Sequence, residues 1–91
     1  MTSAVLFERR SITMNKGVPG PLVDQLSRDE DEMVRVGIAG RESWPASVLE
    51  RLVIDPSILV REKLAINETL PSRALERLSL DIEARVRRGV A

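Results

Sequence analysis

Residues 44–67 read WPASVLERLVIDPSILVREKLAIN, and this stretch decides the fold because its pattern recurs along the chain. Equivalent residues stand 26 positions apart. The recurring columns are Pro19, Pro45 and Pro71; Leu26, Leu52 and Leu78; Asp29, Asp55 and Asp81; and Arg35, Arg61 and Arg87. A fixed period of this length is typical of stacked supersecondary units, each of which buries its apolar side against a neighbour.

Each unit carries the signals for two short helices. In the quoted stretch Pro45 suits the first turn of a helix, and Val48 and Leu52 belong to one apolar stripe. Asp55 and Pro56 end this helix and start a second one, because Asp is a strong N-cap and Pro fits the position after it. The unit is therefore predicted to be a helix pair.

Local signals refine the expected helix ends. Ser47 followed by Glu50 forms a capping box if the first helix starts slightly later, and Asn67 is a plausible terminator of the second. In the first unit the second helix is expected to open with the acidic run 29–32, which complements the positive end of the helix dipole. The third unit is expected to repeat the apolar pattern with Ala74, Leu75, Leu78, Ile82, Val86 and Val90.

The period makes the chain, residues 1–91, a single repeat domain. Residues 3–15 match a second helix without its partner, since Arg9 stands 26 positions before Arg35. The predicted fold is all-α, a short right-handed alpha-solenoid in which stacking stabilises helices too short to persist alone. Its parts are a leading helix at 3–15 and helix pairs at 19–41, 45–67 and, incomplete at its last turn, 71–91.

Composition narrows the function. The 91 residues contain 14 basic and 14 acidic side chains, so no net field attracts the chain to nucleic acid or to an anionic membrane. The absence of Cys and His excludes disulfides, thiolate or imidazole metal sites and His-based catalysis. No phosphate-binding glycine loop occurs, because residues 17–21 form a proline-rich turn. We therefore expect no catalytic residues, no metal site, no cofactor and no enzyme activity.

The compartment is inferred from the same composition. Residues 1–7 lack the basic flank and long apolar core of a signal peptide, and no apolar run approaches the roughly 20 residues that span a bilayer. The absence of Cys fits the cytosol. We expect a cytoplasmic protein without a membrane span, of bacterial or phage origin, since an excess of Arg over Lys often accompanies a GC-rich genome.

The motif Pro-x3-Leu-x2-Leu-x2-Asp-x4-Val-Arg-x3-Ala resembles HEAT-type alpha-solenoid repeats, and most of all the short repeats of the leucine-rich repeat variant class. The resemblance covers residues 3–91, and an Asp stands six positions before an Arg in all three units, as in HEAT repeats. Some members of that class carry a Cys-rich iron–sulfur segment, which this chain lacks. The resemblance implies an architecture but leaves the function open.

The arginine column, which includes Arg9, allows two interpretations. In one, the guanidiniums of Arg35, Arg61 and Arg87 grip phosphates or an acidic partner. In the other, which we favour, they form a structural ladder with aspartates of their own or the adjacent repeat. Residues six apart do not face each other on one helix, but an Asp at a helix start can receive an Arg from the stacked unit. The ladder residues are Asp29, Arg35, Asp55, Arg61, Asp81 and Arg87.

The second helices of the pairs are the candidate recognition surface, because second helices line the concave side of HEAT-type arrays. At three positions of these helices the residue type differs between units, although the surrounding pattern repeats. A binding surface would show such variation, and so would solvated positions that are under no selection. Glycine inside a helix costs about 1 kcal/mol against alanine, which suits a close approach to the backbone. The candidate partner-binding residues are Phe7, Arg10, Met33, Val36, Gly37, Glu62, Lys63, Arg85 and Arg88, and Gly89 shares a column with Gly37.

Trp44 also has two interpretations. It stands just before Pro45, as Leu70 stands before Pro71, and a hydrophobic staple onto the first helix is the favoured one. The alternative is an exposed aromatic anchor at an interface.

Together these features predict a protein–protein interaction module, such as an adaptor, inhibitor or regulatory scaffold, that binds another protein through the second-helix face. One alternative is binding of a nucleic-acid backbone through the arginine column and the basic ends, which zero net charge and scarce aromatics disfavour. The other is a purely structural module, since open solenoid ends allow self-association.

Overall fold

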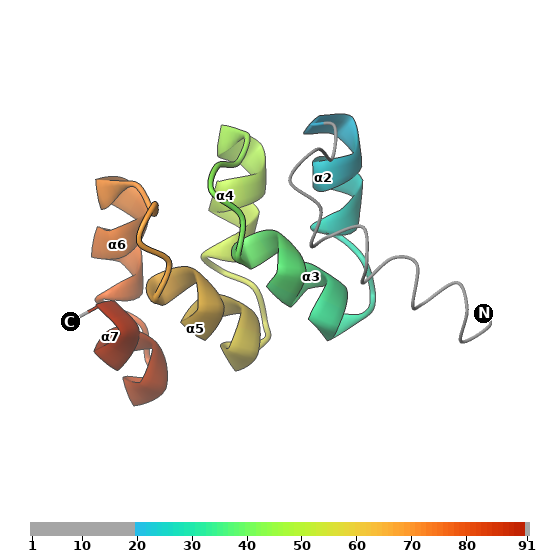
Figure 1. Cartoon of the computed structure of the whole chain (residues 1–91). Coiled ribbons are helices and arrows are strands. Elements are labelled where there is room, and N and C mark those ends of the chain that lie inside the picture. Colours follow the sequence, from blue (N-terminus) through green and yellow to red (C-terminus); the bar gives the residue numbers. More distant parts are fainter. Residues whose placement is uncertain (1–19, 91) are drawn as a thin grey trace.

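The computed structural model describes residues 20–90, which fold into six helices joined by short turns (Figure 1). The helices are α2 (Gly20–Leu26), α3 (Glu32–Ala39), α4 (Ala46–Leu52), α5 (Ile58–Ala65), α6 (Ser72–Leu78) and α7 (Ala84–Val90). Within this range the chain forms no strand, so the predicted all-α class is confirmed. The predicted leading helix at 3–15 and Pro19 lie outside the described residues.

The helices alternate between two rows. In Figure 1, α2, α4 and α6 follow one another along one row, while α3, α5 and α7 follow one another along the other. The second row is the more tightly associated, since α5 packs against both α3 and α7. Three pairs of equivalent helices, 26 residues apart, pack on each other: α2 with α4, α3 with α5, and α5 with α7.

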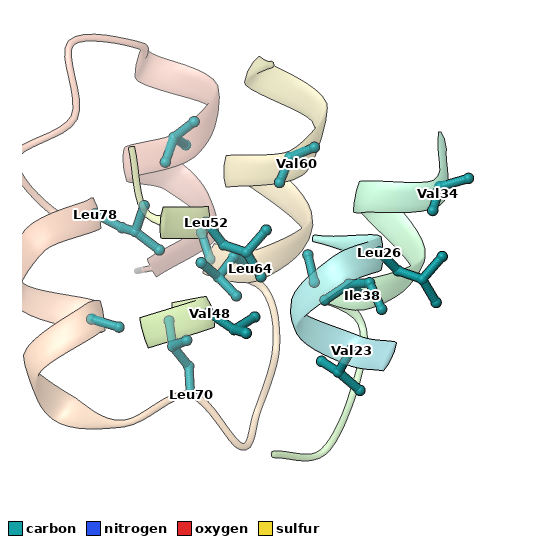
Figure 2. Close-up of a cluster of buried hydrophobic side chains, with 14 residues drawn as sticks. Val23, Leu26, Val34, Ile38, Val48, Leu52, Val60, Leu64, Leu70 and Leu78 are labelled. Atoms are coloured by element: carbon teal, nitrogen blue, oxygen red, sulfur yellow. The ribbon is translucent and has the colours of Figure 1, made fainter. Parts of the chain in front are cut away.

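Equivalent residues of the successive helix pairs fill one continuous core (Figure 2). Leu26, Leu52 and Leu78 are at most 4% exposed, and the equivalent valines Val34, Val60 and Val86 of the second helices are fully buried. Because the aliphatic stripes of neighbouring pairs meet, no pair has to bury its apolar side alone. The core residues are Val23, Leu26, Val34, Ile38, Ala39, Val48, Leu52, Val60, Leu64, Ala65, Leu70, Ala74, Leu78 and Val86.

The second helices begin later than predicted. Helix α5 has Ser57 rather than Asp55 as its N-cap, and the Ser57 hydroxyl accepts the Val60 N–H at 3.4 Å. Asp55 lies two residues earlier, where its Oδ1 accepts the Ser57 N–H at 2.8 Å. The acidic run is likewise not helical from its start, because α3 has Asp31 as its N-cap. The aspartate thus closes a turn ahead of the helix, and this position leaves its other oxygen for a second partner.

Local expectations for Pro45, the capping box and Ile82 are also wrong. Pro45 is the N-cap of α4 rather than its first residue, and no side chain caps that end, so the capping box of Ser47 and Glu50 does not form. Ile82 is 89% exposed, because it lies in the turn before α7 rather than on its buried side. Asn67 directly follows Ile66, the C-cap of α5, which is the position of a terminating Asn.

Candidate functional site

The arginine column lies at the joints between successive helix pairs. Arg35 on α3 donates from Nη1 to the backbone oxygen of Asp29 at 2.7 Å, in its own pair. Its Nε and Nη2 reach the carboxylate of Asp55, in the next pair, at 2.9 and 3.4 Å. One guanidinium therefore ties the turn before its own helix to the turn before the following one, and its planar fork matches the carboxylate.

The next joint repeats this arrangement. Arg61 donates from Nη1 to the Asp55 backbone oxygen at 2.6 Å, and from Nε and Nη2 to the Asp81 carboxylate at 2.7 and 3.4 Å. The Asp81 Oδ1 also accepts the Glu83 N–H at 2.9 Å. Burial would raise the pKa of Asp81, but the Glu83 N–H and the Arg61 guanidinium stabilise its charged form more strongly, so the pKa lies below its ordinary value.

Both internal ion pairs are nearly closed to solvent. The side chains of Arg35 and Asp55 are 15% and 4% exposed, and those of Arg61 and Asp81 are 11% and 9% exposed. In both arginines Nε, Nη1 and Nη2 each donate a hydrogen bond within the fold. They belong to the stacking contacts and do not offer a phosphate-binding row.

Arg87 makes only half of this joint. It donates from Nη1 to the Asp81 backbone oxygen, as its equivalents do, and it is exposed. Within residues 20–90 no carboxylate meets its Nε and Nη2. The predicted ladder is thus complete at two arginines and half made at the third, while Arg9 lies outside the described residues.

Other polar contacts between neighbouring pairs were not expected from the sequence. The Ser57 hydroxyl donates to Glu32 at 2.8 Å, and the Asn67 amide donates to the backbone oxygens of Ala39 and Arg41 at 3.0 and 2.7 Å. Their columns hold different residue types in each unit, so no repeated signal marks them. A deviation from the repeat at a buried or half-buried polar position is the clue that could have found them.

Trp44 has its ring packed against the core, and its Nε1 donates to the Ile38 backbone oxygen at 2.8 Å. The side chain closes over the end of α3 rather than standing free. Its environment fits a packing role, and the equivalent residue in the next unit, Leu70, is 6% exposed.

The second-helix face presents two apolar side chains at equivalent positions. Met33 on α3 and Leu59 on α5 are 44% and 40% exposed, and the two helices stack on each other. Arg85, at the same position on α7, pairs with Glu62 through Nη2 and Oε1 at 3.0 Å. The face therefore has an apolar strip that ends in an exposed ion pair.

The remaining candidates of this face differ in accessibility. Val36 and Gly37 are half-buried, and Val36 packs against the core. Lys63 is exposed, and its Cε lies 3.0 Å from the point where a β-carbon on Gly40 would stand. Arg88 is exposed and donates to the Ala84 backbone oxygen. Phe7 and Arg10 lie outside the described residues.

Gly89 has an internal explanation. A β-carbon there would stand 3.0 Å from both the Ala65 Cβ and the Ile66 Cγ2. The end of α5 therefore approaches the backbone closely at this glycine.

The part of the chain that the structure describes has neither a metal-binding cluster nor a membrane-spanning helix. None of its acidic side chains gathers into a group of three or more that could hold a metal ion. None of the helices between residues 20 and 90 has the length and apolar character needed to cross a membrane. Comparison of the chain with protein-family models, curated proteins and solved structures gives no match.

Proposed function

We propose that the chain is a short right-handed alpha-solenoid of the HEAT-like kind and that it binds another protein through its second-helix face. The observation that carries the proposal is the contrast between two columns of the same helices. The guanidiniums of Arg35 and Arg61 are used inside the fold, whereas Met33 and Leu59 remain exposed on stacked helices.

The chemistry of this strip favours a protein ligand. Exposed apolar side chains at neighbouring positions gain free energy when a partner covers them, and a charged rim selects the partner's orientation. The rim here includes the Glu62–Arg85 ion pair and the exposed Lys63. A nucleic-acid backbone would instead need free cations in the arginine column, where two are already paired.

Affinity capture from the native host with paired variants tests the proposal. Met33→Asp with Leu59→Asp should abolish capture of the protein that the wild-type chain retains, because each change places an unpaired charge in the apolar contact. Ile54→Asp is the matched control, since Ile54 is 61% exposed but lies in the turn between α4 and α5. It should leave capture intact.

Two results would contradict the proposal. One is equal capture by the double variant and by the wild-type chain, provided that circular dichroism shows both folded. The other is retention of duplex DNA in place of a protein, with a binding constant that falls steeply as salt is added.

A further inference from the structure

The two joints between successive helix pairs carry different sets of polar contacts. The first joint, between α2–α3 and α4–α5, and the second joint, between α4–α5 and α6–α7, both have the buried arginine–aspartate pair described above. The first joint also has a bridge between its first helices. There the Arg51 Nη1, on α4, donates to the Asp24 carboxylate of α2 at 3.3 Å and to the buried Ser27 hydroxyl at 2.6 Å.

The equivalent bridge is missing from the second joint. Arg77 on α6 stands where Arg51 stands on α4, but Val53 takes the place of the serine that Arg51 binds. Arg77 is exposed, and among residues 20–90 its side chain has neither an ion pair nor a hydrogen bond. Helix α4 also packs more closely on α2 than on α6. The bridge therefore ties α4 to α2 and has no counterpart between α6 and α4.

A second polar link shows the same difference between the joints. At the first joint the Ser57 hydroxyl, on a buried side chain, donates to Glu32 at 2.8 Å. The equivalent positions of the second joint hold Glu83 and Ile58. Because Ile58 has no polar side-chain atom, this link cannot form there. The first joint is thus held by polar contacts in both rows of helices.

Apolar contacts take the place of the missing links at the second joint. Val53 and Ile58 are half-buried and pack against the core. Such contacts stabilise the stacking but leave its angle free to change, since the hydrophobic effect has no preferred direction. The ion pair between Glu62 and Arg85 also crosses this joint, but it is exposed, and exposed pairs contribute little. Among residues 20–90 the buried arginine–aspartate pair is therefore the one buried side-chain bond that orients α6–α7 on α4–α5.

We infer that the second joint is a hinge, at which α6 and α7 rotate as one body about the Arg61–Asp81 pair while the spacing between α4 and α6 changes. The first joint keeps its angle. Every contact compared here lies between residues 24 and 85, so the inference concerns the inside of the described fold. It goes beyond the proposed function, but it bears on it, because a rotation between α5 and α7 changes the shape of the second-helix face.

Distance distributions between paired spin labels test the hinge. The chain contains no Cys, so two introduced cysteines are the only labelling sites. Ser47→Cys with Arg73→Cys places labels at equivalent exposed positions of α4 and α6, and Pro21→Cys with Ser47→Cys does so for α2 and α4. We expect the α4–α6 distribution to be at least about 1.5 times as wide as the α2–α4 distribution. Equal widths, or a wider α2–α4 distribution, would overturn the inference.

Two equivalent substitutions show whether the bridge makes the difference. Arg51→Gln removes the bridge and should widen the α2–α4 distribution. Arg77→Gln is the matched control, because it makes the same change on α6 and should leave the α4–α6 distribution as it is. In chains that circular dichroism shows folded, an unchanged α2–α4 distribution with Arg51→Gln would count against the hinge. So would a widening of the α4–α6 distribution with Arg77→Gln. The comparison of the two label pairs decides the matter even where Arg51→Gln does not fold.

Discussion

At the scale of single residues, Asp81 shows how one carboxylate serves two elements. It closes the turn before α7 through the Glu83 N–H and binds the Arg61 guanidinium of the preceding pair. Asp55 does the same for α5 and Arg35. Because both oxygens of a buried charge are satisfied, the desolvation penalty is offset by hydrogen bonds in a fixed geometry.

The lowered pKa of Asp81 predicts a loss of stability in acid. A carboxyl group whose pKa is lower in the folded state contributes stability above its unfolded pKa, about 3.9, and loses it as the pH falls through the folded value. At pH 7 we expect Asp81→Asn to be less stable than the wild-type chain. The difference should shrink as the pH falls below about 4.

Urea unfolding at a series of pH values between neutral and strongly acidic measures this difference. Glu68→Gln is the control, because Glu68 is exposed, and it should change the unfolding free energy by less than about 0.5 kcal/mol. A gap between Asp81→Asn and the wild-type chain that stays constant with pH would contradict the role assigned to the carboxylate.

At the scale of helices, α5 begins differently from α4 and α6. Helix α5 has a side-chain cap from Ser57, which also donates its hydroxyl proton to Glu32 on the neighbouring α3. Helices α4 and α6 have a proline at the N-cap and no side-chain cap. Proline at that position fixes the entry of the chain but leaves the first N–H groups to water.

This difference predicts unequal effects of two serine substitutions. Ser57→Ala should lower the unfolding free energy by about 0.5–2 kcal/mol, because it removes the cap of α5 and leaves Glu32 without its partner. Ser47→Ala, on the exposed side of α4, should be neutral within about 0.5 kcal/mol. Thermal unfolding of both variants compares them, and a larger loss for Ser47→Ala would restore the capping box that the sequence suggested.

Sequence reasoning at this scale found the helix pairs but misplaced their second helices. The apolar columns of Leu52 and Val60 predict which sides are buried, because burial repeats with the period. The exact start of α5 depends on whether Asp55 or Ser57 caps it, and both residue types are good caps. In the structure Asp55 instead binds Arg35, a residue 20 positions earlier, and Ser57 is left as the N-cap of α5.

At the scale of the whole molecule, the polar joints alternate with a continuous aliphatic core. The aliphatic contacts stabilise stacking without direction, whereas Arg35 and Arg61 each donate to one carboxylate in a fixed geometry. The sequence predicted the columns that make the joints, since they repeat. It left open whether each arginine meets its own aspartate or the next, because both stand in the same column.

The candidate binding surface was less predictable than the fold. Met33 was chosen as a candidate because its column varies between units, and both Met33 and its equivalent Leu59, which was not chosen, are exposed. Arg85 lies in the same column but is paired with Glu62, which its position alone does not reveal. A residue type that differs between units is not required by the repeat. The contacts of that side chain then indicate whether it serves packing or recognition.

The central claim is that Arg35 and Arg61 each join their helix pair to the next one, and double-mutant cycles of unfolding free energy test it most directly. Arg35→Gln with Asp55→Asn should give a coupling of about 1–3 kcal/mol. Arg61→Gln with Asp55→Asn should give less than about 0.5 kcal/mol, because Arg61 meets only the backbone oxygen of Asp55, which the substitution retains. A larger coupling in the second cycle than in the first would contradict the account.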